Sequence, residues 1–245
     1  MCRFIFALVL LLATCTVLGA PAPKGSWDRP IDPDQDCKFA SRGGTVTIEI
    51  PGTDHDLAPK RKRFNAPRVL RQVEGDFVMQ ARVSGSFHPS PKSSADGEDP
   101  SVAAGLVLIP ADGNCIRLEY GAYRRKGEQR SCPAFRVRGE QLINLEIDWD
   151  VPRKKDTHAK TEEDIYSRLV RRGHFIYEAI SPDGEEWTYE YRLEDRKLPA
   201  KLKVGLAAYS TSTEPFKAHF DKFKLQLGRS GEEDRNNIAT FRRPN

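Results

Sequence analysis

The stretch Ser167-Arg-Leu-Val-Arg-Arg-Gly-His-Phe-Ile-Tyr-Glu-Ala-Ile-Ser-Pro-Asp-Gly-Glu-Glu-Trp187 decides the fold of this chain. An amphipathic run ends at Arg-Arg-Gly, and a second run follows in which Phe175, Tyr177 and Ala179 recur at period two. The Ser-Pro-Asp-Gly turn leads into a third run, because Pro presets φ and Gly accepts a positive φ. Short strands joined by tight turns in this way are typical of an all-β sandwich.

The same alternation predicts strands on both sides of this stretch. Thr45–Ile50 alternates apolar and polar residues, whereas Val102–Ile109 is apolar on both faces and predicts a central strand. In the last strand the apolar phase shifts between Phe220 and Phe223, which predicts a β-bulge. Further strands are predicted at 66–73, 77–83, 116–120, 133–137, 142–149 and 201–210. Roughly a dozen strands and no helix predict one domain of two packed sheets.

The first 20 residues have the layout of a secretory signal peptide. A cationic start is followed by the apolar run Phe4–Leu12 and by small residues that end at Ala20. The apolar run is too short for an ordinary transmembrane helix. An alternative interpretation takes Leu12-Ala-Thr-Cys15 as a lipoprotein motif, in which Cys15 carries the lipid. Both interpretations predict an exported protein.

The remaining chain divides into a sandwich domain at 26–228 and a polar tail at 229–245. The tail has no apolar pattern, which predicts disorder. Charged residues make up 30% of the sequence, but the net charge is only +4. Such a balance requires neither nucleic acid nor an anionic membrane as a partner. No Gly-rich phosphate loop and no Ser/His/Asp triad order is present, so the sequence does not indicate a nucleotide enzyme or a triad hydrolase.

Three cysteines lie beyond the signal peptide. Cys115 and Cys132 flank a predicted hairpin, and because export favours oxidation we expect them to form a disulfide. The alternative is two buried free thiols. Cys37 is then left over, either buried or available for a bond between two chains. No Cys-x-x-Cys and no Cys/His cluster occurs in the sequence, so we expect no zinc site.

An ordered series of short motifs resembles the DUF1349 family. The residues that carry the resemblance are Ala66-Pro67, Gly75-Asp76-Phe77, Ala104-Gly105-Leu106, Ile116-Arg117-Leu118-Glu119, Leu169 to Gly173, Ser181 to Trp187, Val204-Gly205-Leu206 and Phe220 to Phe223. The resemblance covers roughly residues 27 to 227, nearly the whole exported chain. It implies a concanavalin A-like jelly-roll sandwich of the lectin/glucanase superfamily, with two antiparallel sheets. It implies no particular reaction, because this fold hosts many functions.

One strand is similar to the acidic signature of jelly-roll endoglucanases. In Leu145-Glu146-Ile147-Asp148-Trp149-Asp150, period two places the three acids on one face. A retaining glycosidase needs two carboxyl groups about 5–5.5 Å apart, which makes Glu146 and Asp148 the candidates for catalysis. The alternative is a strand with Ile147 and Trp149 in the core and carboxylates in water. We favour the alternative and therefore a protein that is not an enzyme.

A binding face is the more favoured hypothesis. Its candidates are residues that we expect opposite the core phase on central strands, together with aromatic residues near turns. They are Arg117, Glu119, Tyr123, Arg171, Glu178, Trp187 and Tyr189. No cofactor is expected, although the loop pairs Asp54/Asp56 and Asp96/Asp99 are alternatives for calcium.

The sequence therefore predicts an exported binding module for a glycan or another cell-envelope component. The competing hypotheses are a glycoside hydrolase or lyase that uses Glu146 and Asp148, and a structural interaction domain that dimerises through Cys37.

Overall fold

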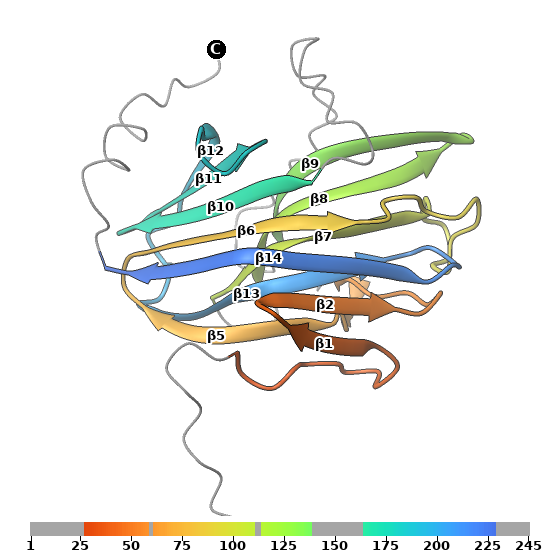
Figure 1. Ribbon diagram of the computed structural model, residues 1–245, viewed down its shortest axis with the longest axis horizontal. Helices are drawn as coiled ribbons and strands as arrows, with labels where there is room; N and C mark the ends of the chain where they lie inside the picture. The colour runs from red at the N-terminus through yellow and green to blue at the C-terminus, as the bar shows by residue number, and fades with distance from the viewer. Residues whose placement is uncertain (1–26, 59–60, 111–113, 139–163, 229–245) are drawn as a thin grey trace, which may run out of the picture.

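The protein folds into two antiparallel sheets packed face to face, as the computed structural model shows (Figure 1). The structure describes residues 27–58, 61–110, 114–138 and 164–228. The predicted signal peptide, the acidic strand with Glu146 and Asp148 and the predicted disordered tail lie outside these residues. No described residue belongs to a helix that is long and apolar enough to cross a membrane.

The larger sheet has seven strands in the order β1-β2-β14-β6-β10-β11-β12. Strands β2, β14, β6 and β10 run across the front of Figure 1. The bounds are β1 Lys38–Arg42, β2 Thr45–Ile50, β6 Phe77–Gly85, β10 Ile165–Arg172, β11 Phe175–Ser181, β12 Thr188–Glu194 and β14 Phe216–Leu227. The second and the last strand of the chain thus lie side by side in one sheet, because β2 pairs with β14.

The smaller sheet has five strands in the order β5-β13-β7-β8-β9. Their bounds are β5 Arg68–Glu74, β7 Ser101–Ile109, β8 Cys115–Arg125, β9 Glu128–Arg138 and β13 Lys201–Ser210. A short hairpin of β3 (Leu57–Ala58) and β4 (Arg63–Phe64) forms a separate two-stranded sheet. The chain passes repeatedly from one large sheet to the other, which is typical of a jelly roll. The predicted all-β sandwich of two antiparallel sheets is confirmed.

The core lies between the two sheets because every strand alternates its side chains. On β13, Leu202, Val204, Leu206 and Ala208 face inward, as the sequence pattern predicts. The largest fully buried side chains include the aromatic group Phe87, Tyr120 and Phe216. Phe87 meets the Tyr120 ring edge-on at 4.9 Å between centroids, a favoured aromatic geometry.

Two details of the sequence pattern are confirmed by the strand register. Strand β7 lies in the middle of the five-stranded sheet, between β13 and β8, as its two apolar faces predict. In β14 the register against β6 shifts between Asp221 and Lys224, and Lys222 has a φ of 49°. The β-bulge predicted from the spacing of Phe220 and Phe223 is therefore present.

Candidate functional site

The outer face of the five-stranded sheet is not an ordinary solvated face. Residues that alternate with the core positions on this sheet form a second apolar cluster, which includes Leu70, Val107 and Tyr209. The β3–β4 hairpin packs on this cluster through Leu57 and Phe64. Charged side chains that share the face are therefore partly removed from water, where electrostatic interactions are stronger.

Arg117 on β8 is the centre of a closed ionic network on this face. Its Nε donates to Glu119 Oε2 at 2.7 Å, and its Nη1 donates to Asp56 Oδ1 at 2.6 Å. The guanidinium lies over the Tyr209 ring, 3.6 Å from the centroid. Burial alone would lower the pKa of Arg117, but the carboxylates of Glu119 and Asp56 raise it well above its ordinary value. The residue is a permanently charged structural group.

Arg63 extends the network toward the hairpin and the loop before β7. Its Nη2 donates to Glu98 Oε1 at 2.7 Å and lies 3.4 Å from Asp56 Oδ2. Its Nη1 donates to Asp54. Asp54 and Asp56, which the sequence analysis named as alternative calcium ligands, are thus paired with arginines.

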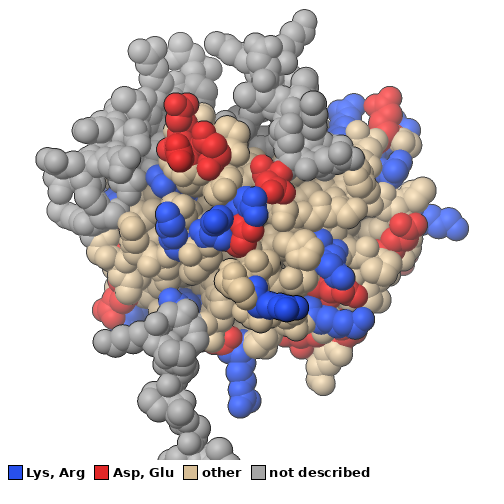
Figure 2. All heavy atoms as spheres, in the orientation of Figure 1, with Lys and Arg blue, Asp and Glu red and all other residues tan. Residues whose placement is uncertain are grey.

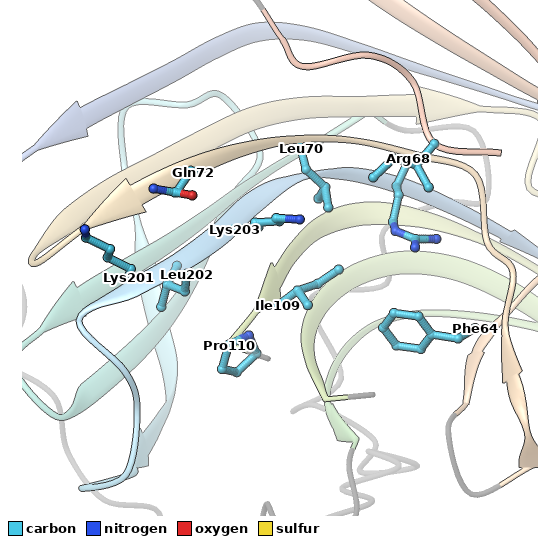
Figure 3. A pocket seen from close by; sticks show the side chains of 10 residues that line it. Phe64, Arg68, Leu70, Gln72, Ile109, Pro110, Lys201, Leu202 and Lys203 are labelled. Atoms are coloured by element: carbon cyan, nitrogen blue, oxygen red, sulfur yellow. The ribbon is translucent and has the colours of Figure 1, made fainter. Parts of the chain in front are cut away.

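A pocket opens beside this network on the same face of the sheet. Its volume is about 190 Å³, and Figure 3 shows side chains from β5, β13, β7 and β4 around it. The lining residues are Ile31, Phe64, Arg68, Leu70, Gln72, Ile109, Pro110, Lys201, Leu202 and Lys203. Six of the ten lining residues are apolar, four are polar or charged, and none is acidic. Apolar walls beside convergent polar groups are compatible with binding of a small chemical group.

Arg68 is the buried cation of the pocket. It is only 7% exposed. Its Nη1 donates to the Ala66 carbonyl at 2.7 Å, and its guanidinium lies 5.1 Å from the Phe64 ring centroid. Its Nε has no hydrogen-bond partner. Among the residues that the structure describes, no carboxylate pairs with Arg68.

The electrostatics of Arg68 differ from those of Arg117. Burial lowers the pKa of Arg68, and the opposing effects of Tyr209 and Cys115 do not compensate the lost hydration. The neighbouring Tyr209 hydroxyl is also buried and also lacks a hydrogen-bond partner. Unpaired buried polar groups are costly, so each of them needs an explanation, such as a bound water, an ion or a ligand.

Two lysines add positive charge at the other end of the pocket. Lys201 and Lys203 enter from β13, and the register places Lys203 opposite Gln72 of the neighbouring strand β5 (Figure 3). Lys201 lies 3.8 Å from Glu74, but both side chains are 65% exposed, so this ion pair is weak. Three cations around apolar walls favour an anionic ligand that also has an apolar surface.

Two of the predicted binding residues, Arg171 and Glu178, lie on the opposite face of their strands from the one that the sequence predicted. Arg171 shares its face with the core residue Leu169, and its guanidinium donates to the carbonyls of Gly173, Leu198 and Ala200. Glu178 likewise shares the inward phase of Ile176 and is 4% exposed. The prediction that they lie opposite the core was wrong, because it assumed that charged strand residues point to solvent.

The other predicted binding residues are not gathered on one surface. Arg117 and Glu119 are on the outer face, but the network and the hairpin bury them. Tyr123 lies further along β8, opposite Ser101. Trp187 is covered by Arg168, whose guanidinium is 3.8 Å from its ring centroid. The backbone of Tyr189 pairs with Ala179 of β11. The predicted set is therefore not brought together as one site.

The outer face of the seven-stranded sheet carries charges of both signs. Figure 2 shows Lys and Arg side chains interspersed with Asp and Glu on the face turned to the viewer. Ion pairs between strands account for several of them, such as Lys217 with Glu49 at 2.9 Å. A mixed pattern of this kind is an ordinary solvated surface.

The predicted Cys115–Cys132 disulfide is wrong. Cys115 is buried and forms no disulfide, and its Sγ lies 3.6 Å from the Leu57 carbonyl oxygen. The β8–β9 register places Cys115 opposite Arg138 and Cys132 opposite Gly121. Six residues along a strand correspond to roughly 20 Å, far beyond the Cα separation of a disulfide.

Sequence reasoning missed Arg68 and the two lysines of the pocket. Period two does place Arg68, Leu70 and Gln72 on one face of β5, and Lys201 and Lys203 on one face of β13. The missing information is that β5 and β13 are neighbours, although about 130 residues separate them in the chain.

The sandwich is similar to solved structures in fold. A functionally unknown protein from Saccharomyces cerevisiae has 16% identity and a TM-score of 0.54, over 84% of this chain and 97% of that one. Basic winged bean lectin has 10% identity and a TM-score of 0.47, over 80% of this chain and 90% of the lectin. The alginate lyase from Klebsiella pneumoniae has 11% identity and a TM-score of 0.46, over 78% and 84%. No family model and no curated protein matches the sequence. The likeness to the yeast protein shows a shared fold, so function has to be argued from the site.

Proposed function

We propose that this protein is an exported, non-enzymatic binding module whose pocket receives the acidic group of a glycan. The observation that carries the proposal is Arg68, a buried guanidinium with a free Nε and no acidic partner among the described residues. A carboxylate is the natural complement of a guanidinium, since it can accept two parallel hydrogen bonds.

The walls of the pocket support a sugar rather than a bare inorganic anion. Phe64, Leu70, Ile109 and Pro110 line the pocket beside the cations. A uronate ring has apolar C–H faces that can pack on such side chains while its carboxylate reaches Arg68. Lys201 and Lys203 would meet further acidic groups of the same chain. Export is predicted from residues 1–20 and gives the protein access to cell-envelope and extracellular glycans.

Calorimetric titration with an acidic oligosaccharide and its neutral derivative tests the proposal. The two probes are an oligogalacturonate and the same compound as its methyl ester. We expect the acid to bind and the ester not to bind, and we expect affinity to fall as salt is added. Equal binding of the two compounds, or no binding of acidic glycans on a broad array, would contradict the proposal.

The variant Arg68→Gln tests the role of the guanidinium itself. Loss of a charge-assisted hydrogen bond should weaken binding of the acid about tenfold or more. The variant should not lower the melting temperature, because it removes a buried charge that has no acidic partner in the described structure. Arg196→Gln removes a charge from an exposed pair with Glu194 and serves as the control, with unchanged affinity. Unchanged affinity in Arg68→Gln would show that the pocket is not the site.

A further inference from the structure

Three different metal-ligating side chains meet where the chain enters the sandwich. Asp36 and Cys37 directly precede β1, and His55 lies shortly before β3, in an isolated β-bridge with Ser210. His55 Nε2 is 3.2 Å from Asp36 Oδ1 and 3.7 Å from Cys37 Sγ, and the Sγ is 3.4 Å from the same Oδ1. An oxygen, a sulfur and a nitrogen donor thus form a triangle with sides of 3.2, 3.7 and 3.4 Å.

This triangle has the size of one face of a zinc tetrahedron. Zinc binds sulfur at about 2.3 Å and nitrogen or oxygen at about 2.0–2.1 Å. At the tetrahedral angle, these lengths give donor separations of about 3.3 Å for N–O and about 3.5 Å for S–N and S–O. Each observed separation is therefore within about 0.2 Å of the value for a bound ion. The ligand atoms need almost no movement to close around a cation.

The orientation of His55 is fixed by groups outside the triangle. Its Nδ1 lies 3.3 Å from the Asn65 carbonyl oxygen, which can only accept a hydrogen bond. A proton on Nδ1 satisfies this carbonyl and leaves the lone pair of Nε2 for a cation beside Asp36 and Cys37. Metal-binding histidines are held in this way by a backbone carbonyl behind the ring. The His55 backbone is in turn anchored to the end of β13 by two hydrogen bonds with Ser210, at 2.8 and 3.0 Å.

The surroundings of the triangle favour a cation and leave a path to it. Asp34 Oδ2 lies 3.7 Å from the far side of the imidazole, and Asp32 Oδ2 accepts the Cys37 amide at 2.9 Å. His55 is completely buried, whereas the side chain of Asp36 is 33% exposed. The site is thus built on a rigid buried nitrogen and opens to solvent through its carboxylate.

We propose that Asp36, Cys37 and His55 form a binding site for a divalent cation of the zinc class. A mixed sulfur, nitrogen and oxygen donor set suits Zn²⁺ and does not suit Ca²⁺ or Mg²⁺, which prefer oxygen alone. The fourth position is left to water or to the Thr53 hydroxyl, which lies 2.9 Å from His55 Nε2 and 3.0 Å from Asp36 Oδ2. Binding converts the Cys37 thiol into a thiolate and releases one proton to the solvent.

The site is independent of the glycan pocket and was not predicted from the sequence. The expectation that the chain has no zinc site was based on local spacing, and His55 lies 18 residues after Cys37. The topology brings the two together because β1 and β2 form a hairpin that returns the chain to its starting point. A bound ion would fasten the segment before β1 to the end of β13.

Titration of the chelator-treated, exported chain with Zn²⁺ tests the proposal, with Ca²⁺ and Mg²⁺ as comparison ions. We expect Zn²⁺ to bind at one site with a rise in melting temperature, and the other two ions not to bind. Replacement by Co²⁺ should give the visible absorption of a tetrahedral site and a near-ultraviolet thiolate-to-cobalt band. Absence of Zn²⁺ binding overturns the proposal.

Two variants and one control assign the ligands. Cys37→Ser should abolish the thiolate-to-cobalt band and weaken Zn²⁺ binding at least tenfold, and Asp36→Asn should weaken binding without removing the band. Cys115→Ala removes a buried thiol on the outer face of the five-stranded sheet and should change neither result. Circular dichroism confirms that each variant is folded. A cobalt band that survives in Cys37→Ser, or that disappears in Cys115→Ala, also overturns the proposal.

Discussion

Arg117 and Arg68 lie on the same outer face, but different groups surround their buried guanidinium charges. Arg117 has carboxylates at hydrogen-bonding distance, whereas Arg68 has one carbonyl and an aromatic ring. Removal of one partner of a compensated buried pair leaves the other charge buried and uncompensated, whereas removal of a charge that has no acidic partner does not. The two arginines should therefore respond differently to removal.

Substitution of Arg117 should be strongly destabilising. Arg117→Leu removes the guanidinium that Glu119 and Asp56 share, and removal of one partner of a buried ion pair costs about 3–5 kcal/mol. Chemical denaturation measures this loss of unfolding free energy. The double variant Arg117→Leu/Glu119→Leu should recover part of it, because one buried carboxylate is removed as well. A loss below about 1 kcal/mol in the single variant, as for an exposed pair, would contradict the prediction.

At the scale of single elements, the bulge in β14 is tied to its neighbour by an ion pair. Arg82 of β6 donates through Nε to Asp221 Oδ1 at 2.7 Å, at the position where the β14 register shifts. This hydrogen bond lowers the pKa of Asp221 below its ordinary value, while burial opposes the shift. The pair therefore stabilises the folded state only while Asp221 is ionised.

The contribution of this ion pair should appear in the dependence of the unfolding free energy on pH. Since the pKa of Asp221 is lower in the folded state, its contribution is present above the unfolded value of about 3.9 and is lost as the pH falls through the folded value. Asp221→Asn should lower the unfolding free energy by about 1 kcal/mol at pH 7, because both side chains are partly exposed. The difference from the unchanged protein should shrink below about pH 4. Glu128→Gln, which changes a side chain that is 77% exposed, is the control. A loss of unfolding free energy in Asp221→Asn that stays constant with pH would contradict the prediction.

The elements were predictable where one local pattern decides them. Thr45–Ile50 and Lys201–Ser210 are strands with the predicted bounds, and the phase shift at Phe220 correctly marks the bulge. Arg171 was placed on the wrong face because no local pattern shows that carbonyls of a distant loop receive its guanidinium. The pocket was not predictable for the same reason, since it depends on β5 lying beside β13.

At the scale of the whole molecule, the sandwich depends on pairings between the two ends of the chain. Strand β14 lies between β2 and β6, and its Phe216 and Phe220 are buried in the common core. Both neighbours lose a partner if β14 is absent, and the core is opened along its length. Contacts this distant in sequence also predict folding in milliseconds to seconds, as for other all-β sandwiches.

Truncation distinguishes the strand from the tail that follows it. A chain that ends at residue 228 keeps every described strand, and because residues 229–245 have no apolar pattern we expect an unchanged cooperative thermal transition. A chain that ends at residue 215 lacks β14 and should show no such transition by calorimetry and no sheet signal by circular dichroism. Loss of the transition on removal of the tail alone would show that the tail contributes to the fold, contrary to the sequence prediction. Retention of the transition without β14 would show that the remaining strands re-pair, which the unpaired edges of β2 and β6 make unfavourable.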